Sequence, residues 1–491
     1  MPDADRVFLW GHAMDVSELH SRFEAMRAAS RAQADTPLLL RRERLLRLQK
    51  LLQDNEARLC ASVQADFGQR SARVTTLTEL LPLHSQLRQA LGALRRWAAP
   101  RPEATPWYFW PARAWVQPMP LGVIGVIAPW NYPLLLSLGP LVSALAAGNR
   151  VIIKPSEYTP QTMALLAELL PSYFADDEVA LLAGDAGASA ELAALPLDHL
   201  LFTGSAATGR KVALAAANQL VPTTLELGGK SPCLLEQSCD IQDAARKIAH
   251  AKLLNAGQTC IAPDYVLLPR SSAAAFVEAY TQAVQRMYPQ LQGNPDYTSV
   301  IHAAHASRLL GMLAQAEQAG AQVIRLAGGG EEVSQSRIGD GISRQLVPAL
   351  VLGVGAQMQL MQEEIFGPVL PVLQYDDREE AIAAINHGEI PLALYWFGQD
   401  RRQGRDVAQR VRAAGMCMND CLLQFAHGAL PFGGWGKSGW GALHGYHGFM
   451  GFSHGKPVLR QGSWSAAAWL YPPYGRRFDG LMRWLGRSFM R

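Results

Sequence analysis

The sequence contains few cysteines and has little net charge. Only six of its 491 residues are cysteine, and no two form a CxxC pair, so a disulfide-stapled fold is excluded and no metal site is expected. Lys and Arg total 45 against 42 Asp and Glu, a net charge of +3, which gives no reason to expect a nucleic-acid partner. Apolar residues make up 49% and charged residues 18%, as in a globular chain of two or three domains.

An export signal and a membrane-spanning helix are also missing. Asp3, Asp5 and Arg6 stand where a signal peptide needs an apolar core, so we expect a cytoplasmic protein. Residues 114–149 carry no charge, a stretch longer than the ~20 residues of a spanning helix. Five prolines and Asn131 interrupt it, and it therefore predicts a strand, a loop and a helix in a core.

Short β-branched runs alternate with helical patterns from Leu121 onward. The first hundred residues have helical periodicity, with no chemistry visible in them. The later alternation predicts an α/β fold with parallel strands and crossover helices, one of them from about Thr208 to Gln219, in two domains that meet near Glu226.

Three other segments have their own composition. Residues 105–120 are rich in Trp and Pro and alternate like a strand pair, which predicts a β-hairpin on another subunit or on its own domain. Residues 419–455 are rich in glycine and aromatics, typical of an ordered loop system rather than a helix. The tail, 476–491, puts apolar residues on one helical face and arginines on the others.

Cys260 is the strongest catalytic candidate. It lies in the segment NAGQTCIAP (255–263), where a helical pattern ends, Gly257 relaxes the backbone and a turn presents the thiol. A thiolate is a good nucleophile toward a carbonyl carbon. The alternative is a buried structural cysteine.

Glu226 and Asn131 are candidates at strand ends. Glu226 begins ELGGK at the junction of the two domains, as a general base whose pKa would rise on partial burial. Asn131 follows the first strand of the sheet and could donate to an oxyanion together with the backbone N–H of Cys260. The alternatives are a solvated strand-end glutamate and an ordinary turn asparagine.

Two further strand ends suit a dinucleotide. In KPSE, Lys154 and Glu157 could bind a ribose, and the carboxylate favours a free 2′-hydroxyl. The segment from Gly204 to Gly209 reads GSxxxG at a strand-to-helix turn, where a helix N-terminus can bind pyrophosphate. The full GxGxxG pattern is absent, so this motif alone is weak evidence.

Seven motifs in order carry a family resemblance. PWNYP, KPSE, FTGSxxxG, ELGGK, GQTC, EEIFGPV and PFGGWGKSG, between Leu121 and Lys456, resemble the NAD(P)-dependent aldehyde dehydrogenase superfamily. GKSPCLLEQSCDI, GQTCIAPDYVL, FSHGK and YPPYGRR look most like its class 3 branch, which includes coniferyl-aldehyde dehydrogenases. The departures are Trp435, Trp440 and His427, bulky residues near the expected substrate entrance.

The resemblance implies roles for particular residues. Cys260 would be the nucleophile, Glu226 the base and Asn131 the oxyanion donor. The cofactor, NAD with NADP as an alternative, would be held by Trp130, Lys154, Glu157, Gly204, Ser205, Ala206, Ala207, Thr208, Gly209, Glu364 and Phe366.

The resemblance also implies an architecture. A Rossmann-like cofactor domain would comprise residues 1–103 and 121–226, and an α/β catalytic domain 227–447. A β-arm for oligomerisation, 104–120 with 448–462, would join a homodimer, and 463–491 would form a C-terminal tail.

The expected reaction oxidises an aldehyde, aromatic or medium-to-long-chain aliphatic, to the acid through a thiohemiacetal and a thioester on Cys260. The alternatives are transfer of the acyl group to coenzyme A, or a catalytically silent NAD-binding or structural protein. For the tail we expect either peripheral membrane contact, as a cationic amphipathic helix, or packing on its own subunit or dimer mate.

Overall fold

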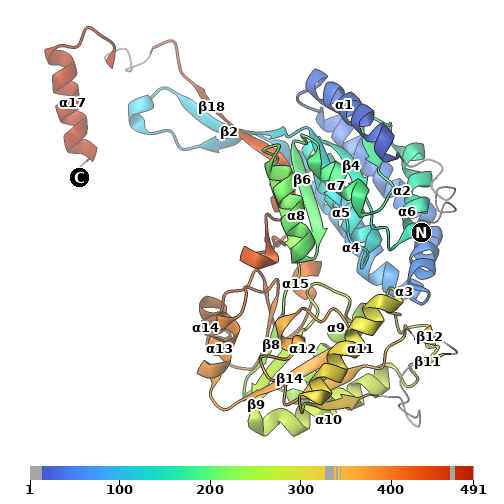
Figure 1. The fold of residues 1–491 in the computed structure, drawn as a ribbon. Helices are drawn as coiled ribbons and strands as arrows, with labels where there is room; N and C mark the ends of the chain where they lie inside the picture. Colours follow the sequence, from blue (N-terminus) through green and yellow to red (C-terminus); the bar gives the residue numbers. More distant parts are fainter. Residues whose placement is uncertain (1–13, 327–336, 339–340, 343, 465–469, 490–491) are drawn as a thin grey trace.

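Two parallel β-sheets flanked by helices form the body of the molecule, and a three-stranded sheet projects from it (Figure 1). The computed structural model describes residues 14–326, 337–338, 341–342, 344–464 and 470–489. The predicted α/β class is confirmed. Asp3, Asp5 and Arg6, on which the absence of an export signal was argued, lie outside the described residues.

The first hundred residues form a helical layer, as their periodicity predicts. Its members are α1 (Val16–Ala32), α2 (Leu38–Phe67), α3 (Ala72–Thr75), the π-helical turn η2 (Thr76–Leu80) and α4 (Leu81–Ala98). Apolar faces of α2 and α4 pack on α5 (Pro133–Ala147). The layer thereby covers one face of the first sheet and reaches the loop that precedes α5.

The first sheet has the order β17-β7-β6-β3-β4-β5, and β3 to β7 are parallel. The chain adds β4 and β5 on one side of β3 and then β6 and β7 on the other, so the strand order reverses at β3, as in nucleotide-binding sheets. The elements are β3 (Val123–Ile127), β4 (Arg150–Lys154), α6 (Pro160–Tyr173), β5 (Val179–Leu181), α7 (Ala186–Ala194), β6 (His199–Gly204), α8 (Ala206–Ala217), β7 (Thr223–Leu227) and β17 (Gly439–Trp440).

The second sheet has the order β10-β13-β14-β9-β8-β15-β16 and is parallel except for the edge strand β10. Its strands are β8 (Pro232–Leu235), β9 (Tyr265–Pro269), β10 (Gln322–Arg325), β13 (Ala349–Leu352), β14 (Val369–Tyr375), β15 (Leu394–Phe397) and β16 (Met416–Met418). The accompanying elements are α9 (Ile241–Leu253), η4 (Leu254–Gly257), η5 (Arg270–Ser272), α10 (Ala273–Met287), α11 (Ala303–Gln318), α12 (Gln359–Gln362), α13 (Arg378–His387) and α14 (Arg401–Arg410), with β11 (Arg337–Ile338) and β12 (Gly341–Ile342) as a separate ribbon.

The projecting sheet joins segments that are far apart in the sequence. β1 (Arg101–Glu103) and β18 (Ser453–Arg460) both pair antiparallel with β2 (Arg113–Pro120), and the 3-10 turn η3 (Trp107–Phe109) lies between β1 and β2. The α-helix α17 (Arg476–Phe489) lies at the far end of this projection (Figure 1).

Two local expectations differ from the structure. The helix expected from Thr208 begins at Ala206, because the Ser205 side chain accepts the N–H of Thr208 and caps the helix. The glycine-rich segment 419–455 contains the short helices α15 (Leu423–Ala426), η6 (Gly436–Ser438) and α16 (Gly445–Gly451). Packing of Phe449 in the first core stabilises α16 despite its glycines.

The uncharged stretch 114–149 is β2, β3 and α5, in agreement with the prediction, and almost all of α5 is buried. Among the described residues, no helix combines the length and apolarity needed to cross a bilayer.

Candidate active site

Cys260 follows a sharp reversal of the chain. After α9, Asn255, Ala256 and Gly257 all adopt positive φ angles, of 54°, 52° and 76°. A Cβ at Gly257 would collide with the carbonyl oxygen of Gly367, so only glycine fits there. Cys260 is partly exposed and borders the apolar core of the second sheet.

The loop after β3 is bonded to the segment that carries Cys260. The side chain of Asn131 donates through Nδ2 to the carbonyl of Gln258, at 3.1 Å, and the carbonyl of Asn131 accepts from Nδ2 of Asn255, at 3.0 Å. This bond uses one of the two N–H groups on Nδ2, and no other hydrogen bond of this nitrogen occurs among the described residues. The structure therefore brings Asn131 next to the cysteine segment.

A buried ion pair supports the same loop from behind, and the sequence analysis missed it. Arg70 donates to the carbonyl of Asn131 at 2.9 Å and pairs with Glu79 at 2.7 Å. The second carboxylate oxygen of Glu79 accepts the N–H groups of Leu134 and Leu135 at the start of α5. The helical layer thus positions Asn131; the sequence carries no motif for this, because a lone Arg and Glu in a helical pattern normally face solvent.

Glu226 is buried at the end of β7, opposite Gly439 of β17. Neither of its carboxylate oxygens has a hydrogen-bond partner among the described residues. Burial raises its pKa well above the usual value. The burial of Glu226 excludes the alternative of a solvated glutamate at a strand end. It leaves a carboxyl group without a hydrogen-bond partner among the described residues, near the end of β7. β17 covers it although it comes from the segment 227–447, which was expected to belong to the catalytic domain.

The thiol of Cys260 lies in the field of two carboxyl groups. Burial raises its pKa, and the nearby charges of Glu364 and Glu226 raise it further. The backbone N–H groups of Cys260 and Ile261 act in the opposite direction by hydrogen bonding. The structure thus gathers Cys260, Glu226 and Glu364, although no direct hydrogen bond between their side chains occurs in the described part of the chain.

Three of the sequence motifs are tied together by one ion pair. Lys230 of ELGGK pairs with Asp264, four residues after the cysteine, and also donates to the carbonyls of Leu360 and Glu363, at 2.6 and 3.0 Å. Asp264 accepts the N–H of Ile365 in EEIFGPV, at 3.0 Å. These bonds explain why residues distant in sequence converge on one place.

Glu364 and Phe366, expected at the cofactor, lie on this tied loop. Burial and the charge of Asp264 raise the pKa of Glu364 to about 8. The N–H of Gly229 and the charges of Lys230 and Lys252 act in the opposite direction and lower it. A Cβ at Gly228 would collide with this carboxylate.

The rings of Trp130 and Phe366 meet edge to face with centroids 5.4 Å apart. The carbonyl of Phe366 is 2.8 Å from Nε2 of His305. This contact holds Phe366 beside Trp130, so the structure places the two predicted aromatic residues side by side.

The carboxyl edge of the first sheet has the groups that a dinucleotide needs. Lys154 ends β4 with its side chain buried and its Nζ 3.2 Å from Glu157, and burial lowers its pKa. Ser205, which caps α8, and the first residues of that helix, Ala206, Ala207 and Thr208, are exposed, and Gly204 is partly exposed. A Cβ at Gly209 would lie 2.6 Å from a methyl of Leu227, so this glycine lets α8 approach β7 closely. The residues therefore fit a ribose and a pyrophosphate.

Aromatic rings lie near the segment that carries Cys260. The hydroxyl of Tyr395 donates to the carbonyl of Ile261, at 2.5 Å, and accepts from Gln424 of α15. The next residue, Phe425, meets the rings of Phe432 and His444. Trp435, Trp440 and His427 are exposed; Trp440 is held on β7 by a bond from Nε1 to the carbonyl of Thr223, at 2.9 Å.

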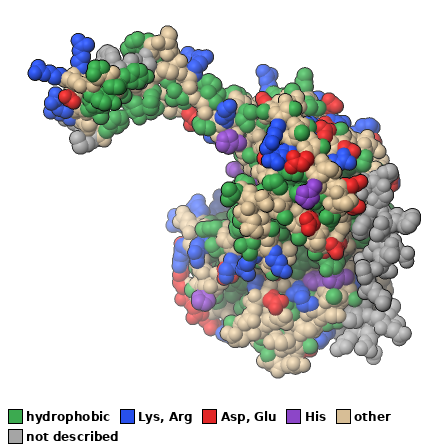
Figure 2. All heavy atoms as spheres, turned by 45° about the horizontal axis from the view of Figure 1, so that its top comes forward, with side chains coloured by type: hydrophobic (Ala, Val, Ile, Leu, Met, Phe, Trp, Pro, Cys, Tyr) green, Lys and Arg blue, Asp and Glu red, His purple; other side chains and the backbone are tan. Residues whose placement is uncertain are grey.

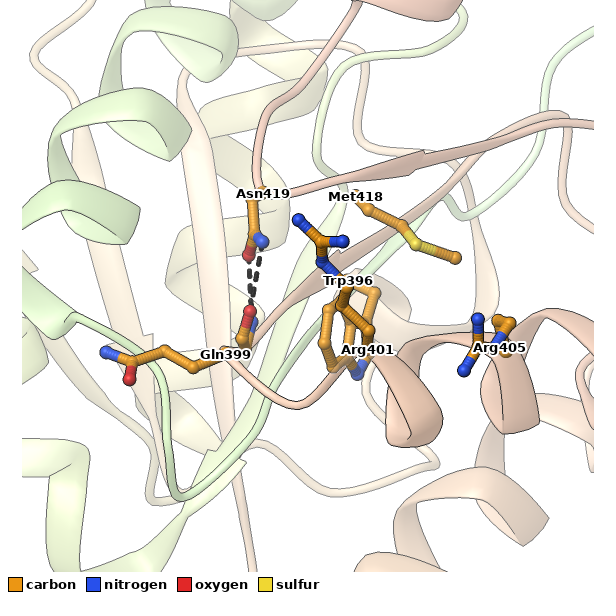
Figure 3. Close-up of a pocket in the computed structure, with 7 residues that line it drawn as sticks. Trp396, Gln399, Arg401, Arg405, Met418 and Asn419 are labelled. Atoms are coloured by element: carbon orange, nitrogen blue, oxygen red, sulfur yellow. Dashed lines mark hydrogen bonds between the residues drawn. The ribbon is translucent and has the colours of Figure 1, made fainter.

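A separate hollow of about 550 Å³ lies at the carboxyl ends of β15 and β16 (Figure 3). Two hydrogen bonds between Asn419 and the backbone of Gly398 close one side of it. Its lining residues are Trp396, Gly398, Gln399, Arg401, Arg405, Met418 and Asn419. None of them is a predicted site residue, so this hollow is distinct from the candidate active site.

Comparison with known proteins gives consistent matches. Residues 1–458 match the family described as the aldehyde dehydrogenase family. A relative from Pseudomonas aeruginosa, "Probable coniferyl aldehyde dehydrogenase", is 43% identical over 98% of both chains. "Aldehyde dehydrogenase family 3 member A2" of Mus musculus is 38% identical over 89% of this chain and 87% of its own. A solved structure, "Substrate bound state of Staphylococcus Aureus AldH", superposes with a TM-score of 0.88 at 32% identity and covers 95% and 99% of the two chains.

Proposed function

The chain belongs to the aldehyde dehydrogenase family, and from this premise we propose that Cys260 is its nucleophile, Glu226 its general base and Asn131 its oxyanion donor. The protein is an NAD(P)-dependent aldehyde dehydrogenase that oxidises an aldehyde to the carboxylic acid. The observation that carries the assignment is the bond from Asn131 to Gln258, two residues before a partly exposed cysteine.

In the proposed reaction the thiolate of Cys260 adds to the aldehyde carbon and forms a tetrahedral oxyanion. The free N–H of Asn131 and the backbone N–H of Cys260 donate to that oxyanion. When bound, the nicotinamide cofactor supplies the acceptor for the hydride that leaves this carbon. The thioester left on Cys260 is cleaved by a water that Glu226 deprotonates, which releases the acid and restores the thiol.

The raised pKa values set the direction of the pH dependence. Cys260 and Glu226 are both shifted upward, mainly by burial, so both are protonated at low pH. Only the ionised forms attack and accept a proton. Activity is therefore expected to rise with pH.

For the cofactor we propose that Lys154 and Glu157 bind the adenosine ribose, and that Gly204 to Gly209 meet the pyrophosphate. Glu364 would bind the nicotinamide ribose, with Trp130 and Phe366 beside the ring. The fit of β4, α8 and the tied loop supports these roles. Preference for NAD over NADP rests on Glu157, whose carboxylate would repel a 2′-phosphate.

We propose an aromatic aldehyde as substrate, with medium-to-long-chain aliphatic aldehydes as the second choice. The rings of Phe425 and Phe432 near the cysteine segment support an aromatic, apolar guest. The name of the Pseudomonas aeruginosa relative points to the same class.

We also propose a homodimer joined through the arm, a cytoplasmic location and peripheral contact of the tail with a membrane. For the dimer, β18 supports the proposal, because among the described strands it is an edge strand to which a strand of another subunit could be added.

Substitution of the nucleophile tests the chemistry. Cys260→Ala should abolish reduced-cofactor formation, followed by absorbance, with a panel of aromatic and aliphatic aldehydes and with NAD and NADP in turn. The matched control is Cys239→Ala, another partly exposed cysteine, which should retain activity. Substantial turnover by Cys260→Ala would contradict the assignment.

Two added measurements separate the alternatives. A rate that requires coenzyme A would favour acyl transfer over hydrolysis. If no aldehyde is turned over, labelling of Cys260 by a thiol reagent that NAD slows would favour a silent NAD-binding protein, and labelling that NAD does not slow would favour a structural protein.

A further inference from the structure

The turn at the end of the arm and the C-terminal tail form a single aromatic surface. Trp107 meets Trp484 of α17 at 5.2 Å between ring centroids, Tyr108 meets Phe489 at 5.3 Å, and Trp110 meets Trp464 at 6.2 Å. We call this set the tip surface: Trp107, Tyr108, Phe109, Trp110, Trp464, Tyr471, Tyr474, Met482, Trp484 and Phe489, all exposed.

Nothing in the described chain covers this surface. No residue of α17 whose burial is described is buried, and Trp107 and Trp484 remain 59% and 52% exposed even though they contact each other. Figure 2 shows the projection as a body of apolar side chains with basic ones at its end. An apolar patch of this extent on an isolated projection marks an interaction site.

The charge of the tip differs from that of the rest of the molecule. Residues 463–491 contain five arginines and one acidic residue, Asp479, a charge of +4, which leaves −1 for residues 1–462. The arginines of α17 in the described chain make no ion pair; they are Arg476, Arg477, Arg483 and Arg487. The cationic tip is thus attached to a nearly neutral body.

We propose that the tip surface docks on an anionic lipid bilayer, an inference that rests on the membrane contact proposed above for the tail and names its residues and its lipid. Trp and Tyr rings favour the headgroup level of a membrane, and arginines beside them pair with lipid phosphates. With 14 residues, α17 is about 21 Å long, shorter than the ~30 Å hydrocarbon core. It therefore lies in the plane of the interface with its apolar side inward.

A second copy of the chain fits this surface less well. Two tips brought together would oppose arginine with arginine, and the body of another copy offers a net charge of only −1 to balance them. The tip also stands away from the body at the end of the arm (Figure 1), so that it can meet a flat surface without obstruction.

Vesicle co-sedimentation of the full chain tests the proposal. The protein should pellet with vesicles of phosphatidylcholine and phosphatidylglycerol, less at high salt, and little with phosphatidylcholine alone. Changing Arg476, Arg477, Arg483 and Arg487 together to Gln should weaken partitioning roughly 100- to 1000-fold. Trp107→Ala with Trp484→Ala should weaken it at both salt concentrations.

A matched control alters the same number of arginines elsewhere. Changing Arg401, Arg402, Arg405 and Arg412 to Gln removes equal charge from the body and should leave vesicle binding unchanged. Equal pelleting of the wild type and both tip variants would overturn the proposal. So would tip variants that change the dimer into a monomer in sedimentation velocity while leaving vesicle binding intact, because the tip would then be a subunit contact. Retained aldehyde turnover verifies that each variant is folded.

Discussion

Two buried glutamates near the candidate active site differ in the number of their hydrogen-bond partners. Glu79 accepts from Arg70 and from two backbone N–H groups at the start of α5. Glu226 is almost as deeply buried, and neither of its oxygens has a partner in the part of the chain that the structure describes.

The difference is the one expected between a structural carboxylate and a general base. An ion pair and two N–H donors stabilise a buried carboxylate and fix its position. A buried carboxyl without partners costs stability, and such groups concentrate where chemistry needs a raised pKa. The comparison indicates that Glu79 holds the loop of Asn131 in place, and it supports the proton-transfer role that we propose for Glu226.

The largest effect is expected on activity, from Glu226→Gln. Loss of the general base should slow thioester hydrolysis roughly 10²- to 10⁴-fold. The acyl-enzyme should then form and persist. A burst of reduced cofactor followed by a slow steady state, with the acyl group detected on Cys260 by mass spectrometry, would verify this. Unchanged steady-state turnover would show that Glu226 is not the base.

The next effect is on stability, from Glu79→Gln. This change leaves the fully buried Arg70 without its counter-charge and should lower the free energy of unfolding by about 3–5 kcal/mol. Denaturant titration measures it. The control is Glu168→Gln, which breaks the exposed pair with Arg58 and should cost less than about 1 kcal/mol. Equal losses in both variants would contradict the supporting role of Glu79.

The third effect is a pH-dependent difference in stability between the wild type and Glu226→Gln, which is smallest near pH 4.5 and grows as the pH rises. Below the ordinary value of 4.5 the carboxyl is protonated in both the folded and the unfolded state. Above it the unfolded chain releases the proton and the folded protein retains it, so the wild type loses stability relative to the variant by up to about 1.4 kcal/mol per pH unit until the folded pKa is reached. Melting temperatures from pH 4.5 to 8 should diverge; parallel curves would mean that Glu226 is not the unpaired buried acid described above.

The sequence motifs predicted the residues that gather at the site. Cys260, Asn131 and Glu364 stand in short segments whose turns and glycines are recognisable without coordinates. Arg70 and Glu79 stand in no such segment, and the helical layer that contains them showed only periodicity. Their role arises because the π-helical turn η2 brings Glu79 to the first N–H groups of α5.

The hairpin of residues 105–120 was predicted from composition and its grouping with 448–462 from the family resemblance, but the contact of its turn with the tail was not predicted. The Trp-rich turn and α17 are separated by more than 350 positions, and no local pattern relates one to the other. Pairing of β2 with β18 is what carries both to the same end of the projection.

By itself, the sequence determined the α/β alternation, the turn that carries Cys260 and the strand ends that we propose to bind a dinucleotide, because these depend on residues close together along the chain. Only the tertiary structure decided which charged groups are paired. Ion pairs such as Lys230 with Asp264 and Arg70 with Glu79 depend on burial and distance, and both are set by how distant elements pack.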